Sequence, residues 1–184
     1  MQLLTRKFTT QQYHQMAKTG IFDPQENLEL ITGEIITMSP VGFRHAFVTN
    51  YLTNFFPRNL GEQAIVSTQN PINLGNESEP RPDVVLLRPR EDFYATQLPT
   101  AADILLLIEV ADTSLTYDRE IKISLYAQHQ VPEVWLINLS QKQLECHTEI
   151  QNNTYQKTKI YQPHQSVSCL TFPTLELNLD KLFT

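Results

Sequence analysis

Apolar side chains after Pro40 repeat every four positions, as expected for a long helix that ends at about Leu60. One row consists of Phe43, Phe47, Tyr51 and Phe55, and a second row consists of Val48, Leu52 and Phe56. Because apolar residues cover more than half of the circumference, we expect a core helix. Two shorter helical patterns cover residues 9–19 and 113–130.

Strands are predicted where apolar runs are short. The runs are VVLL at 84–87, ILLLIEV at 104–110 and EVWLINL at 133–139. The helical pattern at 113–130 connects the second run to the third, so these two strands should be parallel. Turn residues favour two short strands within residues 28–40 and a solvent-facing hairpin within residues 143–161. The pattern predicts an α/β fold: a mixed central β-sheet flanked by helices, with additional β-hairpins.

The composition is that of a folded chain of 184 residues, with 41% hydrophobic and 18% charged residues. No linker or internal repeat is visible, so we expect residues 1–184 to form a single domain. The 14 basic and 20 acidic residues give a net charge of −6, so contact with a nucleic acid must be local, weak or assisted by metal ions. The five glycines are widely spaced, which excludes a glycine-rich phosphate-binding loop.

Membrane, secretory and zinc-binding classes also find no support in the sequence. No apolar run approaches the about 18 residues of a membrane span, and the N-terminal segment lacks the apolar core of a signal peptide. We therefore expect no membrane contact and a cytoplasmic location, where Cys146 and Cys169 are reduced thiols. The histidines show no zinc-ligand spacing, so a structural zinc site is not expected.

Two carboxylates interrupt the apolar strands. Asp83 directly precedes VVLL, and Glu109 lies near the end of ILLLIEV. A carboxylate within such a run needs a cation, hydrogen bonds or a raised pKa. If the two strands are antiparallel neighbours, the start of one lies beside the end of the other. We then expect Asp83 and Glu109 to meet at one edge of the sheet, where oxygen ligands could bind a divalent cation such as Mg²⁺ or Mn²⁺.

A third charged residue comes from the helical pattern at 113–130. At about 100° per residue, Asp118 and Lys122 both fall within the apolar arc of this helix, whereas a solvated ion pair would lie opposite it. The helix begins just after Glu109 leaves its strand, so Lys122 is expected to reach the two carboxylates. A metal held by two acids beside a lysine suits hydrolysis of a phosphodiester. The plainer interpretation is an i,i+4 pair of Lys122 with Asp118 at the surface.

The order and spacing of RPDVVLLRP and LLIEVADTSLTYDREIKISLYAQHQVPEVWLINL resemble the Uma-type restriction endonucleases of the PD-(D/E)-x-K nuclease superfamily. The resemblance implies a single restriction endonuclease-like domain over 1–184 that hydrolyses DNA with Mg²⁺ or Mn²⁺. By resemblance, Asp83 and Glu109 are the metal-binding acids, the Val110 carbonyl is a further metal ligand, and Lys122 is the catalytic lysine displaced onto the helix. Ala111 occupies the position where the superfamily pattern has its lysine.

The resemblance also extends to LELITGEIITMSP with the following His45, and to LELNLDKLF at the end of the chain. It implies that Glu34 is an auxiliary acid and that His45 lines the site. A homodimer is expected, because cutting two strands with one site each favours a pair. Two other readings stay open: a non-catalytic member that binds nucleic acid or protein in mobile-element defence, and a structural protein with an internal ion network.

Overall fold

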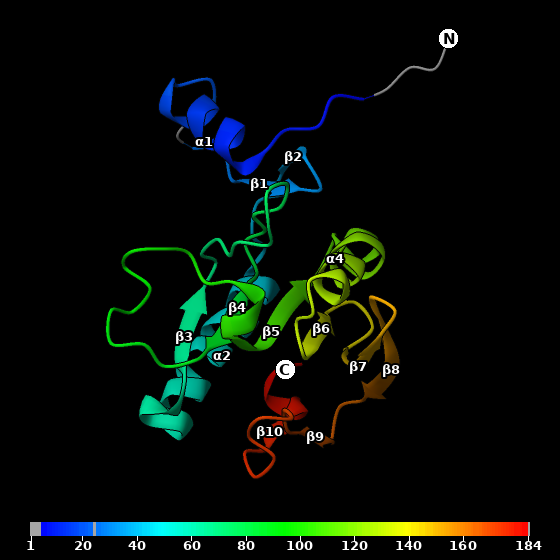
Figure 1. Cartoon of the computed structure of the whole chain (residues 1–184). Coiled ribbons are helices and arrows are strands. Elements are labelled where there is room, and N and C mark those ends of the chain that lie inside the picture. The colour runs from blue at the N-terminus through cyan, green and yellow to red at the C-terminus, as the bar shows by residue number, and fades with distance from the viewer. Residues whose placement is uncertain (1–4, 24, 184) are drawn as a thin grey trace.

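The central sheet has six strands in the order β3-β4-β5-β6-β7-β8 in the computed structural model, which describes residues 5–23 and 25–183 (Figure 1). The strands are β3 (Ile65–Thr68), β4 (Val84–Leu87), β5 (Ile104–Ala111), β6 (Val134–Asn138), β7 (Gln143–Gln151) and β8 (Thr154–Tyr161). Strands β5 and β6 are parallel, and the other neighbours are antiparallel. The mixed sheet and its parallel pair, joined by a helical crossover, are as expected from the sequence.

Helical segments cover both faces of the sheet. The helical segments of the described residues are α1 (Thr10–Lys18), α2 (Phe43–Leu60), α3 (Leu115–Tyr117), the π-helical turn η3 (Asp118–Lys122), α4 (Ile123–Gln128) and the 3-10 turns η1 (Gly61–Gln63), η2 (Ala101–Asp103) and η4 (Leu179–Lys181). Helices α2 and α4 cover the two faces of the sheet, whereas α1 lies in the N-terminal lobe away from it (Figure 1). Helix α2 packs in one core with Leu106 and Ile108 of β5, and α4 packs in a second core with Leu107 from the other face of β5. The alternation of side chains along β5 therefore assigns each residue to one of the two helices.

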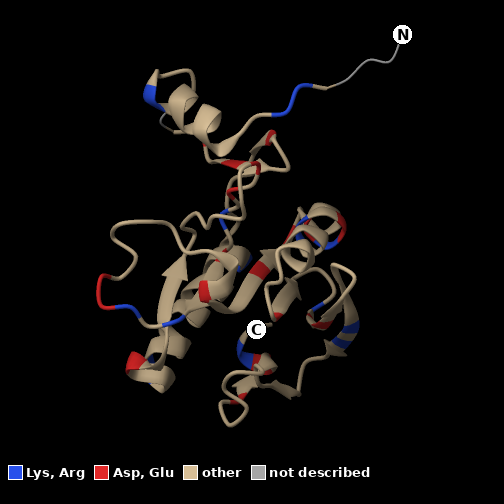
Figure 2. Cartoon of the chain, viewed as in Figure 1, with Lys and Arg blue, Asp and Glu red and all other residues tan. Residues whose placement is uncertain are grey.

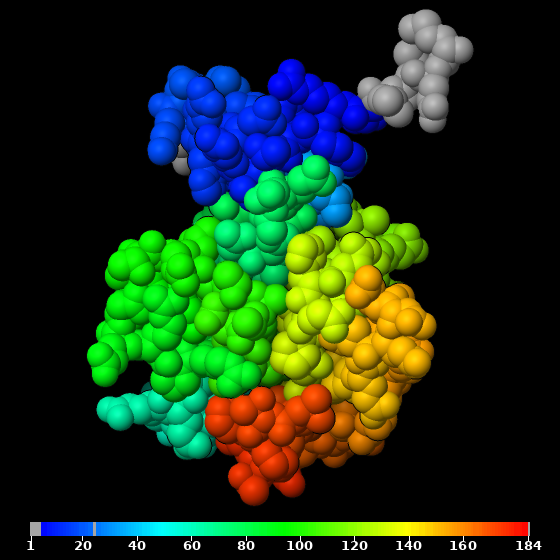
Figure 3. Space-filling model, in the orientation of Figure 1, coloured from blue at the N-terminus to red at the C-terminus, as the bar shows by residue number. Residues whose placement is uncertain are grey.

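Short hairpins complete the two ends of the molecule. Strands β1 (Leu28–Ile31) and β2 (Glu34–Thr37) are joined by Thr32 and Gly33, whose φ angles of 47° and 77° are those of a tight two-residue hairpin turn. Strands β9 (Ser166–Val167) and β10 (Leu177–Asn178) pair near the C-terminus. The N-terminal residues form a lobe at one end of the space-filling view, and the C-terminal segment packs at the other end (Figure 3).

Helix α2 buries only one of its two apolar rows. Val48, Leu52 and Phe56 are at most 2% exposed, whereas Phe43 is 98% exposed and Phe47 is 43% exposed. The expectation of a core helix is therefore correct for one face and wrong for the other. One row is enough to fill the groove above β4 and β5, and the aromatic row is left at the surface.

The hairpin of β7 and β8 differs from the expected solvent-facing one. Most of β7 is buried because it continues the central sheet beside β6, and β8 then forms the outer edge. Lys157 and Lys159 lie on this edge strand, where charge discourages pairing with other chains (Figure 2). In the described part of the chain, none of the helices combines the length and the apolar character that crossing a membrane requires.

Candidate active site

Asp83 and Glu109 face each other where β4 begins and β5 ends. The antiparallel register pairs Val84 with Ile108, so the next step of the same register places Asp83 opposite Glu109. The two apolar runs fold against each other because each is buried on both sides. The juxtaposition expected from the two sequence runs is present.

The carboxylate of Asp83 is fixed by groups from two other elements. Its Oδ2 accepts a hydrogen bond of 2.8 Å from the backbone N–H of Val110, and its Oδ1 lies 3.0 Å from Nε2 of His45 on α2. Burial alone would lower the pKa of His45, but the hydrogen bond and the negative charge of Asp83 outweigh burial and raise it. The imidazole therefore favours its protonated form beside Asp83.

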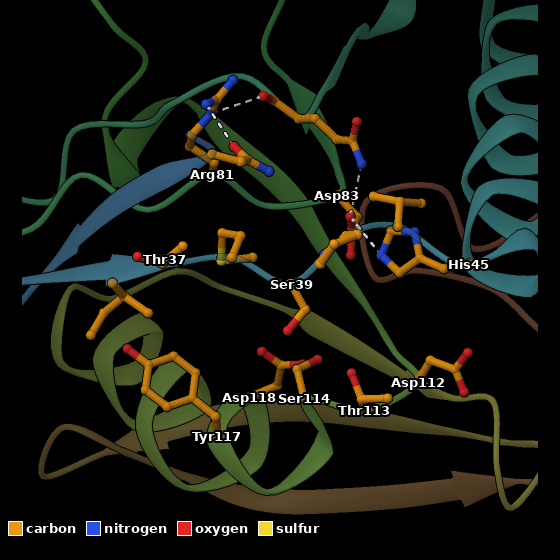
Figure 4. Close-up of a pocket in the computed structure, with 17 residues that line it drawn as sticks. Thr37, Ser39, His45, Arg81, Asp83, Asp112, Thr113, Ser114, Tyr117 and Asp118 are labelled. Carbon is orange, nitrogen blue, oxygen red and sulfur yellow. Dashed lines mark hydrogen bonds and ion pairs between the residues drawn. The ribbon is translucent and has the colours of Figure 1, made fainter. Parts of the chain in front are cut away.

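A cleft of about 390 Å³ opens in front of Asp83. Its walls come from the loop that follows β2, the start of α2 and the start of the crossover helix (Figure 4). The charged and ionisable side chains that line it are His45, Arg81, Asp83, Asp112, Tyr117 and Asp118. The close-up shows Ser39, Ser114 and Asp118 across the cleft from Asp83 and His45 (Figure 4). The cleft is large enough for a small part of a substrate and carries three carboxylates.

Lys122 lies in a buried network next to this cleft. Its Nζ is 3.0 Å from Oε2 of Glu29 on β1 and 3.3 Å from Oε1 of Glu109. The hydroxyl of Tyr126 donates to the same Oε1 of Glu109. The side chains of Lys122, Glu29 and Glu109 are each at most 4% exposed. Oε1 of Glu29 is buried and has no hydrogen-bond partner among the described residues.

Burial dominates the protonation of the carboxylates in this network. It raises the pKa of Glu109 to about 8; the charge of Lys122 acts in the opposite direction, and Asp118 and Asp83 add to the rise. Burial also raises the pKa of Asp118, against the effects of Lys122 and of the hydrogen bond from Ser114. At neutral pH, Glu109 therefore holds a proton for much of the time.

A π-helical turn places the charged residues of the crossover helix. The turn covers Asp118–Lys122, and both end residues are buried although the chain between them is exposed. The wider i→i+5 turn is uncommon and is frequently found at functional sites. Arg119, within the turn, pairs with Glu145 of β7 and so ties it to the sheet. The plainer interpretation of Lys122 as a surface partner of Asp118 is wrong, because both are buried.

The sequence-predicted residues fall into two groups. The structure brings Asp83, Glu109, Lys122 and His45 together, with Val110 joined to Asp83 through its amide. Glu34 lies apart from them: it does not line the cleft, its side chain is 53% exposed, and it pairs with Lys7. This position gives no support to Glu34 as an auxiliary acid.

Sequence reasoning missed Glu29 and the hydroxyl of Tyr126. Glu29 stands between Leu28 and Leu30. In a strand with one solvent-exposed face, alternation of the side chains would place Glu29 on that exposed face. All four residues of β1 are instead buried, because β1 is covered on both sides. Tyr126 falls within the apolar arc of its helix, where an aromatic side chain indicates core packing. Neither position carries a signal that a single sequence reveals.

Comparisons with known proteins identify a family and a similar fold. The family described as "Uma2: Putative restriction endonuclease" matches residues 10–180. Among solved structures, the fold is similar to that of "a putative nuclease belonging to DUF820 from Anabaena variabilis ATCC 29413", with a TM-score of 0.73, 18% identity, and coverage of 90% of this chain and 94% of that one. At this identity the similarity shows the fold alone. No curated protein matches the sequence.

Proposed function

Because the chain belongs to the Uma2 family of restriction endonuclease-like proteins, we propose that it is a metal-dependent nuclease that hydrolyses DNA phosphodiester bonds. The observation that carries the proposal is the meeting of Asp83 and Glu109 at one strand end, with Lys122 hydrogen-bonded to Glu109 from the crossover helix. The acids are proposed to hold Mg²⁺ or Mn²⁺, and Lys122 to assist hydrolysis.

The donor set fits a hard divalent cation. Carboxylate oxygens of Asp83 and Glu109 are the ligands that Mg²⁺ prefers, and Mg²⁺ commonly takes one or two carboxylates together with water and substrate phosphate. Among the described residues, no group of three or more His, Cys, Asp or Glu side chains is placed to hold a metal ion, so the proposal takes the remaining ligands from backbone, water or phosphate. A bound cation would supply Lewis-acid activation of a phosphoryl oxygen and a water of lowered pKa.

Pro82 makes the Val110 carbonyl suitable as a backbone ligand. The β4–β5 register, continued two steps beyond Val84 and Ile108, places Pro82 opposite Val110. Proline has no amide hydrogen, so it cannot donate the ladder bond that the Val110 carbonyl would otherwise accept. In an extended strand, a residue's N–H and C=O point to the same side, and the Val110 N–H points to Asp83. The carbonyl is therefore free on the side of the proposed metal ligands.

The balance of charge supports the same proposal. Asp83, Glu109, Asp118 and Glu29 lie in or beside the cleft, with Lys122 as the buried cation among them. Burial, to which the neighbouring carboxylates add, raises the pKa of Glu109 to about 8. A divalent cation would replace the proton on Glu109, because ligating carboxylates must be deprotonated.

The other residues have positioning tasks in this proposal. Lys122 orients Glu109 through the 3.3 Å contact and places a positive charge next to the cleft, where it would offset negative charge growing on a phosphate. His45 holds Oδ1 of Asp83, which leaves the carboxylate one fixed orientation. Arg81 lines the cleft and is proposed to contact a phosphate group of the DNA.

The test compares Asp83→Asn with Asp92→Asn, the same chemical change at a carboxylate that pairs with Arg90 away from the cleft. Supercoiled plasmid and single-stranded DNA are incubated with each protein in Mg²⁺ or Mn²⁺, and calorimetry measures metal binding. We expect wild type and Asp92→Asn to bind the metal and cut DNA, and Asp83→Asn to lose both. Equal cutting by all three proteins, or no cutting under any condition, would disprove the proposal. Sedimentation of the wild type tests the proposed homodimer.

A second candidate is a non-catalytic nucleic-acid-binding or protein-binding member of the family. Ala111 stands at the usual lysine position, and Lys122 is held by two carboxylates and does not itself line the cleft. This reading predicts a protein without metal-dependent cutting in the assay above. Metal binding that depends on Asp83 would favour the nuclease over this candidate.

A further inference from the structure

Helix α2 differs in charge from the rest of the chain. Its 18 residues include no Asp or Glu, although the whole chain has 20 acids and a net charge of −6. Arg44 and Arg58 lie exposed near its two ends, and Asn50, Asn54 and Asn59 lie exposed between or beside them. The exposed side of α2 therefore carries two arginines and several amides but no acid of its own, although Arg44 pairs with Asp112 from outside the helix.

Aromatic side chains run along the same side. Phe43 is 98% exposed and Phe47 is 43% exposed, and Tyr51 and Phe55 are half-buried against the core. Successive ring centroids from Phe47 to Tyr51 and from Tyr51 to Phe55 are 6.5 and 6.1 Å apart, and the second pair is stacked at 15°. The row from Phe43 to Phe55 spans about 18 Å of helix. The exposed rings of Phe43 and Phe47, continued by the partly exposed Tyr51 and Phe55, form an apolar surface of the kind that marks an interaction site.

Two hollows follow this row, and Phe47 lines both of them. One, of about 190 Å³, is lined by Phe43, Arg44, Phe47, Leu139, Lys142 and Phe183, together with Leu182. The other lies further along α2, between Phe47 and Asn59, and includes Arg58. None of the residues that line these hollows in the described part of the chain is acidic. The aromatic row thus lies between cationic side chains.

The surface is continuous with the cleft that holds Asp83. Gly42 and His45 line the cleft from the first turn of α2, and Phe43 and Arg44 line the neighbouring hollow from the same turn. The helix that carries His45 borders the cleft in Figure 4. A chain molecule lying along α2 would therefore reach the cleft at its N-terminal end.

We propose that this face of α2 binds single-stranded nucleic acid and leads it into the Asp83 cleft; the second part rests on the proposed nuclease function. Exposed aromatic rings stack on unpaired bases, while Arg and Lys side chains contact the phosphates and Asn amides bond to base edges. A duplex hides its base faces and would meet only the cationic groups.

Charge complementarity disfavours a second copy of the chain on this face. A two-fold interface brings the same surface patch of both copies together. Across α2, such an interface would bring the cationic side chains of the two copies (Arg44, Arg58 and Lys142) towards one another, with no acidic residue on the helix to pair with them. Asp112 already pairs with Arg44 at 2.7 Å and lies at the cleft rim. A polyanion is the better occupant.

The test measures fluorescence anisotropy of labelled oligothymidylate, and of a duplex of equal length, with the full chain in EDTA so that no cutting occurs. The variant Phe43→Ala/Phe47→Ala is compared with Phe93→Ala, which removes an aromatic ring that is 73% exposed on another loop. We expect the double variant to bind the single strand about 10- to 100-fold more weakly, with Phe93→Ala unchanged and duplex binding weaker than single-strand binding throughout. Melting temperatures of all three proteins should agree.

Three outcomes would overturn the inference. They are equal single-strand binding by wild type and the double variant, tighter binding of the duplex, and a wild-type dimer that the double variant splits into monomers. Failure of the proposed function gives a different result, because oligothymidylate binding without any metal-dependent cutting leaves this inference standing.

Discussion

Replacing Lys122 with methionine removes the one ammonium from the buried network and keeps a side chain of similar length. At neutral pH, Glu109 already shares its site with a proton because burial raises its pKa to about 8, so it tolerates the loss. In the variant, Oε2 of Glu29 still accepts the 3.2 Å hydrogen bond from the backbone N–H of Arg81, but it loses its 3.0 Å ion pair with the ammonium of Lys122. Removing one partner of a buried ion pair costs about 3–5 kcal/mol, and with one anion orphaned we expect about 3 kcal/mol.

Urea unfolding measures this loss. With a slope of about 2 kcal/mol/M, the midpoint of Lys122→Met should fall by about 1.5 M. The double variant Lys122→Met/Glu29→Gln removes the orphaned charge as well, so we expect it to recover most of the stability. The buried ion pair would be refuted if the single variant had the same urea midpoint as wild type, or if the double variant were no more stable than the single one.

The same pair of variants separates catalysis from structure. Stability alone cannot do so, because Lys122 is buried with carboxylates whether or not it takes part in hydrolysis. If Lys122 assists cutting, the double variant regains stability without regaining activity. If Lys122 is only a structural cation, stability and any cutting return together.

Three further results are expected. Deleting the exposed Glu120 should remove the extra residue that the π turn accommodates and convert the turn to an α turn, with Asp118 and Lys122 still facing the core, so circular dichroism should stay folded and metal binding measured by calorimetry should be retained. Because the folded-state pKa of Glu109 is raised to about 8 from 4.5, its contribution to stability is complete below 4.5 and is lost as the pH rises towards 8. The free energy of unfolding, measured by urea titration in metal-free buffer, should fall by at most about 1.4 kcal/mol per pH unit in this range, and Glu109→Gln should flatten the profile. Glu133→Ala should lower the free energy of unfolding by about 2–3 kcal/mol, because it orphans the buried Trp135 indole N–H and the Leu170 amide; a melting temperature unchanged from wild type would contradict this.

The sheet and the meeting of Asp83 with Glu109 could be predicted because they depend on local signals. Short apolar runs indicate strands buried on both faces, and a helical pattern between two of them requires a crossover. Once β4 and β5 are antiparallel neighbours, the positions of the two acids in their runs place them side by side. A charge that interrupts an apolar strand is visible in one sequence because little else explains it.

The outer face of α2 and the location of Glu29 could not be predicted in the same way. The aromatic row and the row of Val48, Leu52 and Phe56 are both apolar, and the choice between them depends on how the helix is seated over the sheet and the C-terminal segment. Glu29 is buried by elements distant in sequence, including its 3.0 Å contact with Lys122. Tertiary packing decides which face of α2 is exposed and whether Glu29 is buried, and the local sequence pattern predicts neither.

The π turn shows how a correct prediction can rest on an incomplete geometry. Uniform steps of 100° place Asp118 and Lys122 in the apolar arc, and both are buried, yet the segment between them is not an α-helix. The wider π turn changes the rotation of α4 about the helix axis relative to α3, so residues on both sides of the turn can point into the core. Ser114 holds Asp118 at its start, Arg119 pairs with β7, and Glu29 and Glu109 hold Lys122 at its end. These contacts stabilise a turn that backbone preference disfavours, and they bring Asp118 to the cleft and Lys122 to Glu109 at the same time.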